Sequence, residues 1–235
     1  MSEPGSRRGR VHDAEGAREA ILNAAEEVFA EHGFDGARID VIAEIAGYNK
    51  SLIFHYFKDK LELYAQVLRR ADKEINVLQR RIFDTLFEEE VMADASRFKA
   101  LLKETVGEFF DYQIKHPRVM RMVIWEMAEG WQGYAKIMSE RDREDMMEFR
   151  ALLRKAQEAG LFRSGLDPAI QLTLVVYLSM FYESFIPLFQ MLLPDEDFSS
   201  QTVIAQARDY FVELIATGLV VEPPANRARQ KGSET

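Results

Sequence analysis

The chain has 235 residues, enough for one large or two modest domains around a substantial buried core. It contains no cysteine, which excludes disulfide bonds, thiolate metal sites and cysteine catalysis. Its formal net charge of −9 disfavours general adsorption to nucleic acid, so a DNA-binding surface would have to be a small local cluster of cations.

Both ends of the chain are expected to be disordered. Residues 1–14 are rich in Gly, Ser and Arg, and the basic arm formed by Arg7, Arg8 and Arg10 suits either a DNA minor groove or solvent. Residues 222–235 combine two prolines with scattered cations. Because the N-terminal segment has no apolar stretch of the kind that secretory signals contain, the sequence predicts a cytoplasmic protein.

The first predicted helix extends from about Ala17 to His32. Apolar residues recur along one face of it, and Gly33 is expected to end it. The residues of this stripe are Ile21, Ala24, Ala25, Val28 and Phe29. The helix would support the two short helices that follow, which completes a three-helix unit.

Two short helices separated by a turn at Gly47 are predicted over residues 38–57. The apolar residues of the first helix fall at i, i+3, i+4 and i+7, namely Ile39, Ile42, Ala43 and Ala46. Gly47 is expected to adopt the left-handed conformation that ends helices, and Asn49 is a residue type that commonly caps the next one.

The second of these helices would present a polar outer face. Ile53 and Phe57 lie one turn apart and are expected to face the core. The opposite face then carries Ser51 and His55, with Lys58 just past the end of the helix. The flanks and shoulders carry Lys50, Leu52, Phe54 and Tyr56. Such a helix suits a DNA major groove, with its flanks placed for phosphates.

Roughly the first third of the chain contains a set of residues in a characteristic order. Its members are Ala25, Phe29, Gly33, Phe34, Ile39, Ile42, Ala43, Ala46, Gly47, Ile53, Tyr56, Phe57, Lys60 and Leu63. The pattern resembles the helix-turn-helix of TetR-family transcriptional regulators. The resemblance implies a homodimer on a palindromic operator and a helical C-terminal domain that holds a small effector.

The resemblance and the helical wheel together predict which residues contact double-stranded DNA. These are Arg38, Tyr48, Asn49, Lys50, Ser51, Leu52, His55, Tyr56 and Lys60. We expect Tyr56 and Lys60 to contact phosphates, and Lys50, Ser51 and His55 to lie in the groove.

Departures from the family pattern bear on recognition. Ala37 and Arg38 stand where the family usually has Thr or Ser, so the first motif helix lacks its hydroxyl cap. Ser51 and Leu52 replace a pair of small residues, and Phe54 replaces a tyrosine. With fewer polar groups for reading base edges, DNA shape and phosphate contacts are expected to carry more of the recognition.

Helices are predicted through the rest of the chain. A long helix without Pro or Gly, residues 61–87, connects the DNA-binding domain, residues 15–75, to a larger domain, residues 76–221. The N-terminus of the long helix is expected to help Lys60 hold a phosphate. Further helices are delimited by Pro117 and by several glycines.

The last two predicted helices suggest a dimer. The helix that begins at Pro168 is apolar nearly all round over residues 172–185, so it has to be covered on every side. Its most apolar run, residues 172–181, is too short and too polar to span a bilayer, and no membrane contact is expected. A final amphipathic helix covers residues 199–220. In the resembled family such a pair forms a four-helix bundle across the two-fold axis of a dimer.

Methionine and tryptophan residues concentrate in the middle of the chain. Six of the ten methionines and both tryptophans lie between residues 120 and 147. Met-rich surfaces occur at adaptable binding sites, and the resembled family holds its effector in this region. A pocket for a small, apolar effector is therefore predicted, and plain core packing is the competing interpretation of each residue. The candidate residues are Phe109, Met122, Trp125, Trp131, Tyr134, Met138, Tyr177 and Phe181.

No catalytic or metal-binding motif accompanies these features. The four histidines lack metal-ligand spacing, and Gly160 and Gly165 have phosphate-loop spacing without the Lys-Ser or Lys-Thr that should follow. We therefore expect no enzyme, no metal and no cofactor.

The sequence predicts an all-α protein: an N-terminal three-helix helix-turn-helix domain joined by a long helix to a larger helical ligand-binding and dimerisation domain. The predicted function is that of a ligand-responsive transcriptional repressor. The alternative is a helical dimer that binds protein partners or ligands and uses the motif only as structure. That alternative predicts that Lys50, His55 and Lys60 are dispensable.

Overall fold

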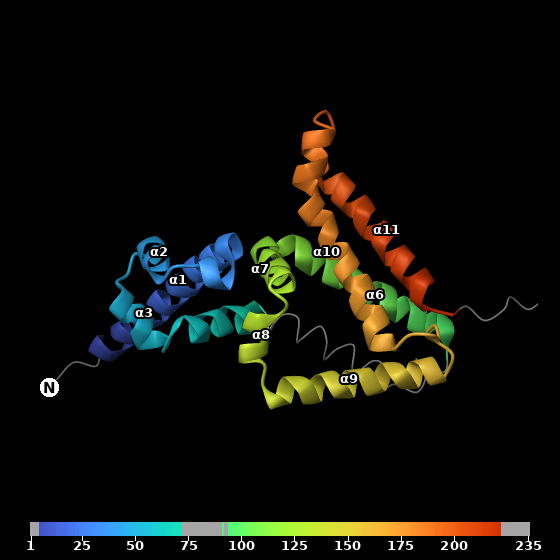
Figure 1. Cartoon of the computed structure of the whole chain (residues 1–235), viewed down its shortest axis with the longest axis horizontal. Helices are drawn as coiled ribbons and strands as arrows, with labels where there is room; N and C mark the ends of the chain where they lie inside the picture. The colour runs from blue at the N-terminus through green and yellow to red at the C-terminus, as the bar shows by residue number, and fades with distance from the viewer. Residues whose placement is uncertain (1–4, 72–90, 92–93, 222–235) are drawn as a thin grey trace, which may run out of the picture. The chain divides into compact units, whose positions relative to one another are not determined.

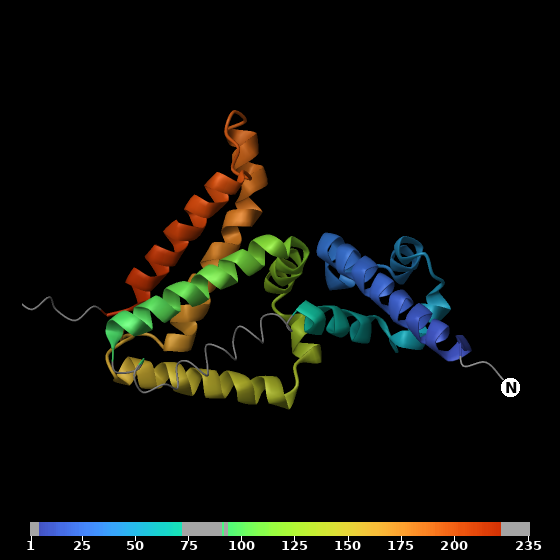
Figure 2. The same ribbon diagram turned by 180° about the vertical axis from the view of Figure 1, so that it is seen from behind.

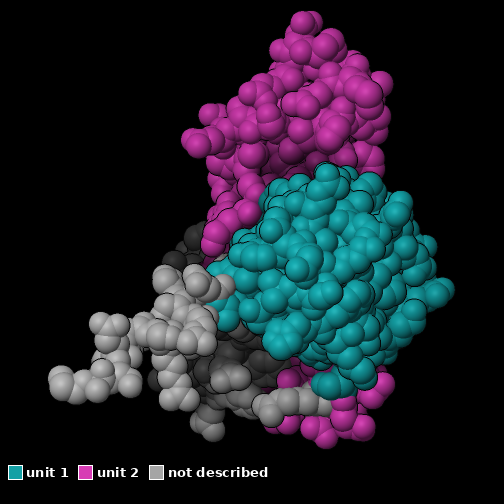
Figure 3. Space-filling model, turned by 90° about the vertical axis from the view of Figure 1, so that its left-hand side faces the viewer, with its two compact units in different colours: residues 1–75, 116–139 teal, residues 76–115, 140–235 magenta. Residues whose placement is uncertain are grey.

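The computed structural model describes residues 5–71, 91 and 94–221. Its regular structure is helical throughout these residues, apart from one isolated bridge between Phe162 and Val220, so the predicted all-α class is confirmed. The chain forms two compact units (Figure 3). Unit 1 comprises residues 1–75 and 116–139, and unit 2 comprises residues 76–115 and 140–235.

Unit 1 consists of helices of very different lengths around one apolar core (Figure 1). They are α1 (Gly5–Gly36), α2 (Ile39–Ala46), α3 (Lys50–Tyr56), the helical residues 60–71, α7 (Pro117–Ala128) and α8 (Gln132–Ile137). The apolar stripe predicted for the first helix is buried in this core, as are the two anchors predicted on α3. The continuation of residues 60–71 as a helix to residue 87 lies outside the described residues.

The first helix differs from the expectation at its start. α1 begins at Gly5, so residues 5–14 are helical where a disordered arm was expected, while residues 1–4 and the predicted tail 222–235 lie outside the described part. Its other end agrees with the prediction, because Gly33 interrupts the helix with φ 67° and ψ −178°. Only glycine adopts such a backbone conformation without strain.

Residues 116–139 join the N-terminal unit, whereas the sequence placed them in the larger domain. Met122 of α7 is buried in the core of unit 1, and Trp125 Nε1 donates a hydrogen bond to the Ala30 carbonyl of α1 at 3.2 Å. Arg118 Nη2 lies 2.7 Å from Glu27 Oε2. The apolar face of α7 is therefore used to cover α1.

Four helices make up most of the described part of unit 2 (Figure 2). They are α6 (Ala95–Lys115), α9 (Glu140–Glu158), α10 (Pro168–Leu192) and α11 (Gln201–Leu219). α6 packs against α11, and α10 contacts α6, α9 and α11. As predicted, α10 begins with a cap: the Asp167 carboxylate accepts the amide of Ala169 at 3.1 Å and also pairs with Arg150 and Arg154.

Much of the apolar surface of α10 is exposed among the described residues. Its exposed residues include Ile170, Leu174, Leu178, Phe181, Phe185 and Leu188. The sequence analysis considered only residues 172–181, which are too few to span a bilayer. The whole of α10 is long and apolar enough to cross one, judged by length and composition alone. The core helix of a soluble protein can pass the same test.

Candidate nucleic-acid interface and effector region

The turn between α2 and α3 depends on Gly47. This residue has φ 74° and ψ 22°, and its N–H donates to the Glu44 carbonyl at 3.2 Å. The following amide, that of Tyr48, donates to the Ala43 carbonyl at 3.0 Å. These bonds satisfy the last carbonyls of α2 and fix the direction in which the chain enters α3.

Gly47→Ala is expected to lower the free energy of unfolding by about 1 kcal/mol, because a Cβ is strained in the left-handed region. Gly16→Ala is the matched control, since Gly16 lies within α1 at an ordinary helical conformation and should gain ~0.5–1 kcal/mol from the better helix former. A Cβ would meet nothing within 4 Å at either position. Chemical denaturation measures both values, and equal effects would contradict the assigned backbone conformations.

α3 is held at its start and along its inner face. Asn49 caps it, with its side-chain oxygen accepting the Leu52 amide at 2.9 Å. Ile53 and Phe57 are each 1% exposed and anchor the helix in the core. At the start of α2, by contrast, Arg38 occupies the cap position without a side-chain hydrogen bond, as expected from the missing hydroxyl.

The outer face of α3 carries the predicted DNA-contacting residues. Tyr48, Asn49, Lys50, Ser51 and His55 are exposed, while Leu52 and Tyr56 are half-buried on the flanks. Two further exposed residues, Phe54 and Lys58, border this face. The surface therefore combines hydroxyl, amide, imidazole and ammonium groups on one short helix.

Asp40 pairs with two of the cationic residues that are predicted to contact DNA. Its carboxylate forms an ion pair with Lys50, and its other oxygen lies 3.7 Å from Arg38 Nη2. All three side chains are well exposed. The sequence analysis missed this pairing, although the position of Asp40 in the first turn of α2 is visible in the sequence.

Lys60 is half-buried rather than fully exposed. Its Nζ donates to the Asp35 carbonyl at 3.2 Å and lies 4.8 Å from the centre of the Phe34 ring. Partial burial lowers its pKa, and the charge of Asp35 opposes this effect. The free amides at the start of the helix formed by residues 60–71 were expected to help Lys60 hold a phosphate. One of them, the amide of Glu62, instead donates a hydrogen bond to the Asp59 carboxylate at 2.8 Å.

The residues predicted for the effector pocket are divided between the units. Met122, Trp125, Trp131, Tyr134 and Met138 belong to unit 1, whereas Phe109, Tyr177 and Phe181 belong to unit 2. In unit 1, Met122 is 1% exposed and Tyr134 packs against the core. The apolar cavity of unit 2 is lined by none of these eight residues, and their role as ligand contacts stays a prediction.

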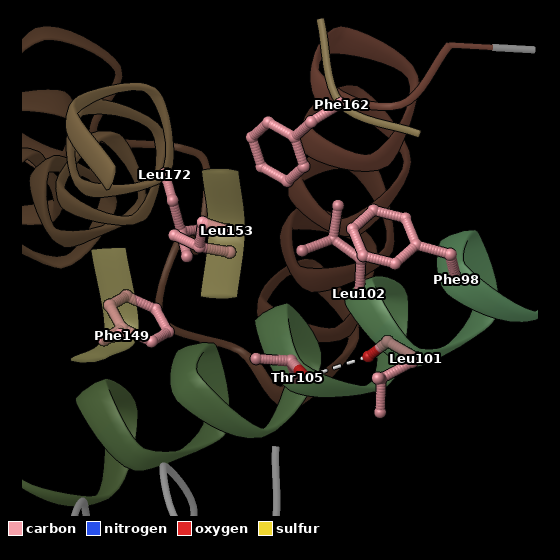
Figure 4. Close-up of a pocket in the computed structure, with 8 residues that line it drawn as sticks. All are labelled: Phe98, Leu101, Leu102, Thr105, Phe149, Leu153, Phe162 and Leu172. Carbon is pink, nitrogen blue, oxygen red and sulfur yellow. Dashed lines mark hydrogen bonds between the residues drawn. The ribbon is translucent and has the colours of Figure 1, made fainter. Parts of the chain in front are cut away.

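Unit 2 contains an apolar cavity of about 40 Å³ (Figure 4). Its lining comes from α6, α9, α10 and the segment before α10: Phe98, Leu101, Leu102, Thr105, Phe149, Leu153, Phe162 and Leu172. The hydroxyl of Thr105 donates to the Leu101 carbonyl at 2.9 Å, so it is satisfied within α6. The cavity suits an apolar group. The sequence could not single it out, because its residues follow ordinary core patterns.

A buried polar contact joins the helical residues 60–71 to α7 and α8. The Tyr64 hydroxyl donates to Oε1 of Glu126 at 2.7 Å, and the Tyr134 amide donates to Oε2 of Glu126 at 2.9 Å. Glu126 is 2% exposed. Burial and this carboxylate raise the pKa of Tyr64, so its phenol remains a neutral donor. No sequence motif pointed to this contact.

Comparisons with known proteins agree with this arrangement. Residues 21–67 match the model for bacterial regulatory proteins of the tetR family, and residues 99–215 match the tetracyclin repressor-like C-terminal domain. The HTH-type transcriptional repressor SCO4008 of Streptomyces coelicolor is 30% identical over 167 residues, which are 71% of this chain and 78% of that protein. The HTH-type transcriptional repressor NicS of Pseudomonas putida is 28% identical over 179 residues, or 74% of this chain and 79% of NicS.

The crystal structure of SCO4942 from Streptomyces coelicolor, described as that of a transcriptional regulator, superposes with a TM-score of 0.58. It is 26% identical, and the alignment covers 86% of this chain and 98% of that one. Within the described residues of our protein, no group of acidic or histidine side chains could hold a metal ion. The chain belongs to the TetR family of bacterial regulatory proteins and is a DNA-binding transcriptional regulator, not an enzyme.

Proposed function

We propose that the protein is a repressor that binds a palindromic operator as a homodimer and is released by a small, largely apolar effector. The observation that carries the proposal is the division of α3 into two faces. Ile53 and Phe57 hold the helix in the core, while Ser51 and His55 on the opposite face are exposed. An α-helix presented in this way fits the major groove and reaches base edges. The repressor would act in the cytoplasm.

The uncovered face of α10 supports the homodimer. A stripe of large apolar residues on α10, continued by Tyr210 and Leu214 on α11, is exposed in the single chain. A second copy of the same pair of helices would cover it and form an isologous interface. Two α3 helices related by a two-fold axis would then read half-sites about one DNA turn, ~34 Å, apart.

Effector release requires that ligand and operator favour different arrangements of the same dimer. The apolar cavity in unit 2 supports a site for an apolar group of the effector. Coupling between two such sites is typically ~1–3 kcal/mol, enough for a change of roughly 5- to 150-fold in operator affinity.

Selection from a random duplex library tests the proposal. Enrichment of a two-fold-symmetric site, bound with an affinity that falls steeply as salt rises, is the expected result. If no sequence is enriched even at low salt, the repressor proposal fails. The alternative, a helical dimer that binds protein partners or ligands without reading DNA, would then explain the chain better.

Two substitutions separate phosphate contacts from base contacts. Lys60→Ala is expected to weaken binding to all sequences alike and to reduce the salt slope by about 1, whereas His55→Ala should change the preferred bases. Because Lys60 also contacts Asp35 and Phe34, the thermal stability of the variant is measured alongside. A change of base preference in the Lys60 variant, or none in the His55 variant, would contradict these roles.

Asp40→Asn is expected to strengthen operator binding. The substitution removes the carboxylate that pairs with both Arg38 and Lys50. Their release should improve the free energy of operator binding by up to about 1 kcal/mol, or roughly fivefold in affinity. The salt dependence should steepen by about 0.9 for each cation gained by DNA. Glu44→Gln makes the same charge change on an exposed residue of α2 and serves as the control. Equal effects of the two substitutions would show that only net charge matters.

A further inference from the structure

α6 and α10 bury two polar side chains against each other in unit 2. Gln113 on α6 is 2% exposed, and Ser179 on α10 is 3% exposed. The Ser179 hydroxyl donates to Oε1 of Gln113 at 2.9 Å. Nε2 of Gln113 is also buried, and no group within the described residues accepts a hydrogen bond from it. Because a buried polar atom without a hydrogen-bond partner is unfavourable, a partner for this side chain is expected.

Glu183 lies one turn after Ser179 on the same face of α10, at a Cβ separation of about 6 Å for helical spacing. Its Oε2 is buried and has no hydrogen-bond partner among the described residues. Pro187, four residues later, lacks the N–H that would normally bond to the Glu183 carbonyl. Glu183 therefore offers a carboxylate oxygen and a backbone carbonyl that both lack their usual donors.

Partial burial disfavours the charged form of the Glu183 side chain. Burial raises its pKa to about 6, and no neighbouring charge within the described residues contributes to this shift. At neutral pH the side chain is still largely ionised, so unit 2 holds a partly buried anion without a described counter-charge. Such carboxylates are usually paired.

We propose that Gln113, Ser179 and Glu183 bind the amino group of the effector, which makes the effector a small apolar amine. The inference rests on the proposed function and names the chemistry of its ligand. An ammonium group supplies the N–H donors and the positive charge that Glu183 lacks. The Gln113 amide can present either its oxygen or its nitrogen to the ligand, because the Ser179 hydroxyl both donates and accepts.

Two aromatic residues close in sequence to this cluster pack against each other. Phe110 precedes Gln113 by one turn on α6, and Tyr182 precedes Glu183 on α10. Their ring centres are 6.0 Å apart.

Calorimetric titration of the full-length protein with phenethylamine and octylamine, each compared with the corresponding alcohol, tests this site. Each amine is expected to bind at least about 10-fold more tightly than its alcohol and to weaken operator binding. Glu183→Gln should remove this preference while leaving the binding of the alcohols within roughly twofold, because it keeps the shape and deletes the charge. Glu196→Gln, which neutralises an exposed carboxylate in the α10–α11 connection, should change nothing.

Thermal denaturation verifies that the Glu183→Gln variant is folded, as expected when a buried charge without a partner is removed. Equal binding of amine and alcohol, or an amine preference that survives Glu183→Gln, would overturn the proposal. Absence of any amine binding in a protein that still selects an operator would overturn it too, and would leave the repressor function standing. Amine binding in a protein that selects no operator would support the site and contradict the repressor.

Discussion

Replacing Glu126 with alanine is expected to lower the free energy of unfolding by about 2–4 kcal/mol. Its carboxylate is almost fully buried and accepts hydrogen bonds from the Tyr64 hydroxyl and the Tyr134 amide. Alanine would remove the acceptor of the buried Tyr64 hydroxyl and of the partly buried Tyr134 amide, at ~1–3 kcal/mol each, before relaxation recovers part of the loss. Chemical denaturation measures the change. Glu44→Ala removes an exposed carboxylate of the same unit and should stay within about 0.5 kcal/mol of the parent protein.

Gly133 provides an independent test of the same contact. A Cβ at this position would overlap Oε1 of Glu126, and the three nearest atoms all belong to that carboxylate. Gly133→Ala alone is therefore expected to cost about 1–3 kcal/mol. In the Glu126→Ala background the obstructing atoms are gone, so the same substitution should cost less than ~0.5 kcal/mol. Simple additivity of the two changes would contradict the contact.

The Glu126 contact also bears on DNA binding. Tyr64 belongs to the core that contains Ile42 of α2 and Ile53 of α3. Loss of its hydroxyl partner is therefore expected to loosen the packing that positions α3. Operator affinity of the Glu126→Ala variant is expected to fall more steeply with temperature than that of the parent protein.

The helix-turn-helix was predictable because its determinants are local. The apolar spacing of α2, the left-handed glycine at residue 47 and the cap at Asn49 each act within a few residues, and each is present as predicted. The same holds for the start of α10 at Asp167 and Pro168. Patterns of this kind depend on helix geometry and on caps, which do not need the rest of the fold.

Contacts between distant residues could not be predicted in this way. Glu126 appears in the sequence as one more acidic residue, and only the packing of α7 beside residues 60–71 brings it to Tyr64. The apolar face of α7 fits either a ligand pocket or a helix interface, and in the structure it covers α1. The unpartnered atoms of Gln113 and Glu183 could not be predicted from the sequence, because only the surrounding fold decides whether a polar atom finds a hydrogen-bond partner.

Ser51→Glu is expected to separate DNA binding from folding. Ser51 is exposed in the first turn of α3, on the face opposite Ile53 and Phe57. An acidic side chain in the first turn of a helix interacts favourably with the helix dipole, so the variant should be as stable as the parent or gain ~0.3–1 kcal/mol. In a DNA groove the same carboxylate would face phosphates and base acceptors. Operator affinity should therefore fall by about 100-fold or more, equivalent to ~2.7 kcal/mol.

The control for this substitution is Gln132→Glu at the exposed start of α8. Both variants add one negative charge to unit 1, so the general effect of a more acidic protein is the same in each, and the difference between them reports the local contact. Binding to the selected operator is measured by titration at two salt concentrations, with thermal denaturation of each variant in parallel. Equal losses in the two variants would place Ser51 outside the DNA interface. A loss confined to Ser51→Glu, in a protein that is no less stable, would place the outer face of α3 against the DNA, because neither misfolding nor net charge would then explain it.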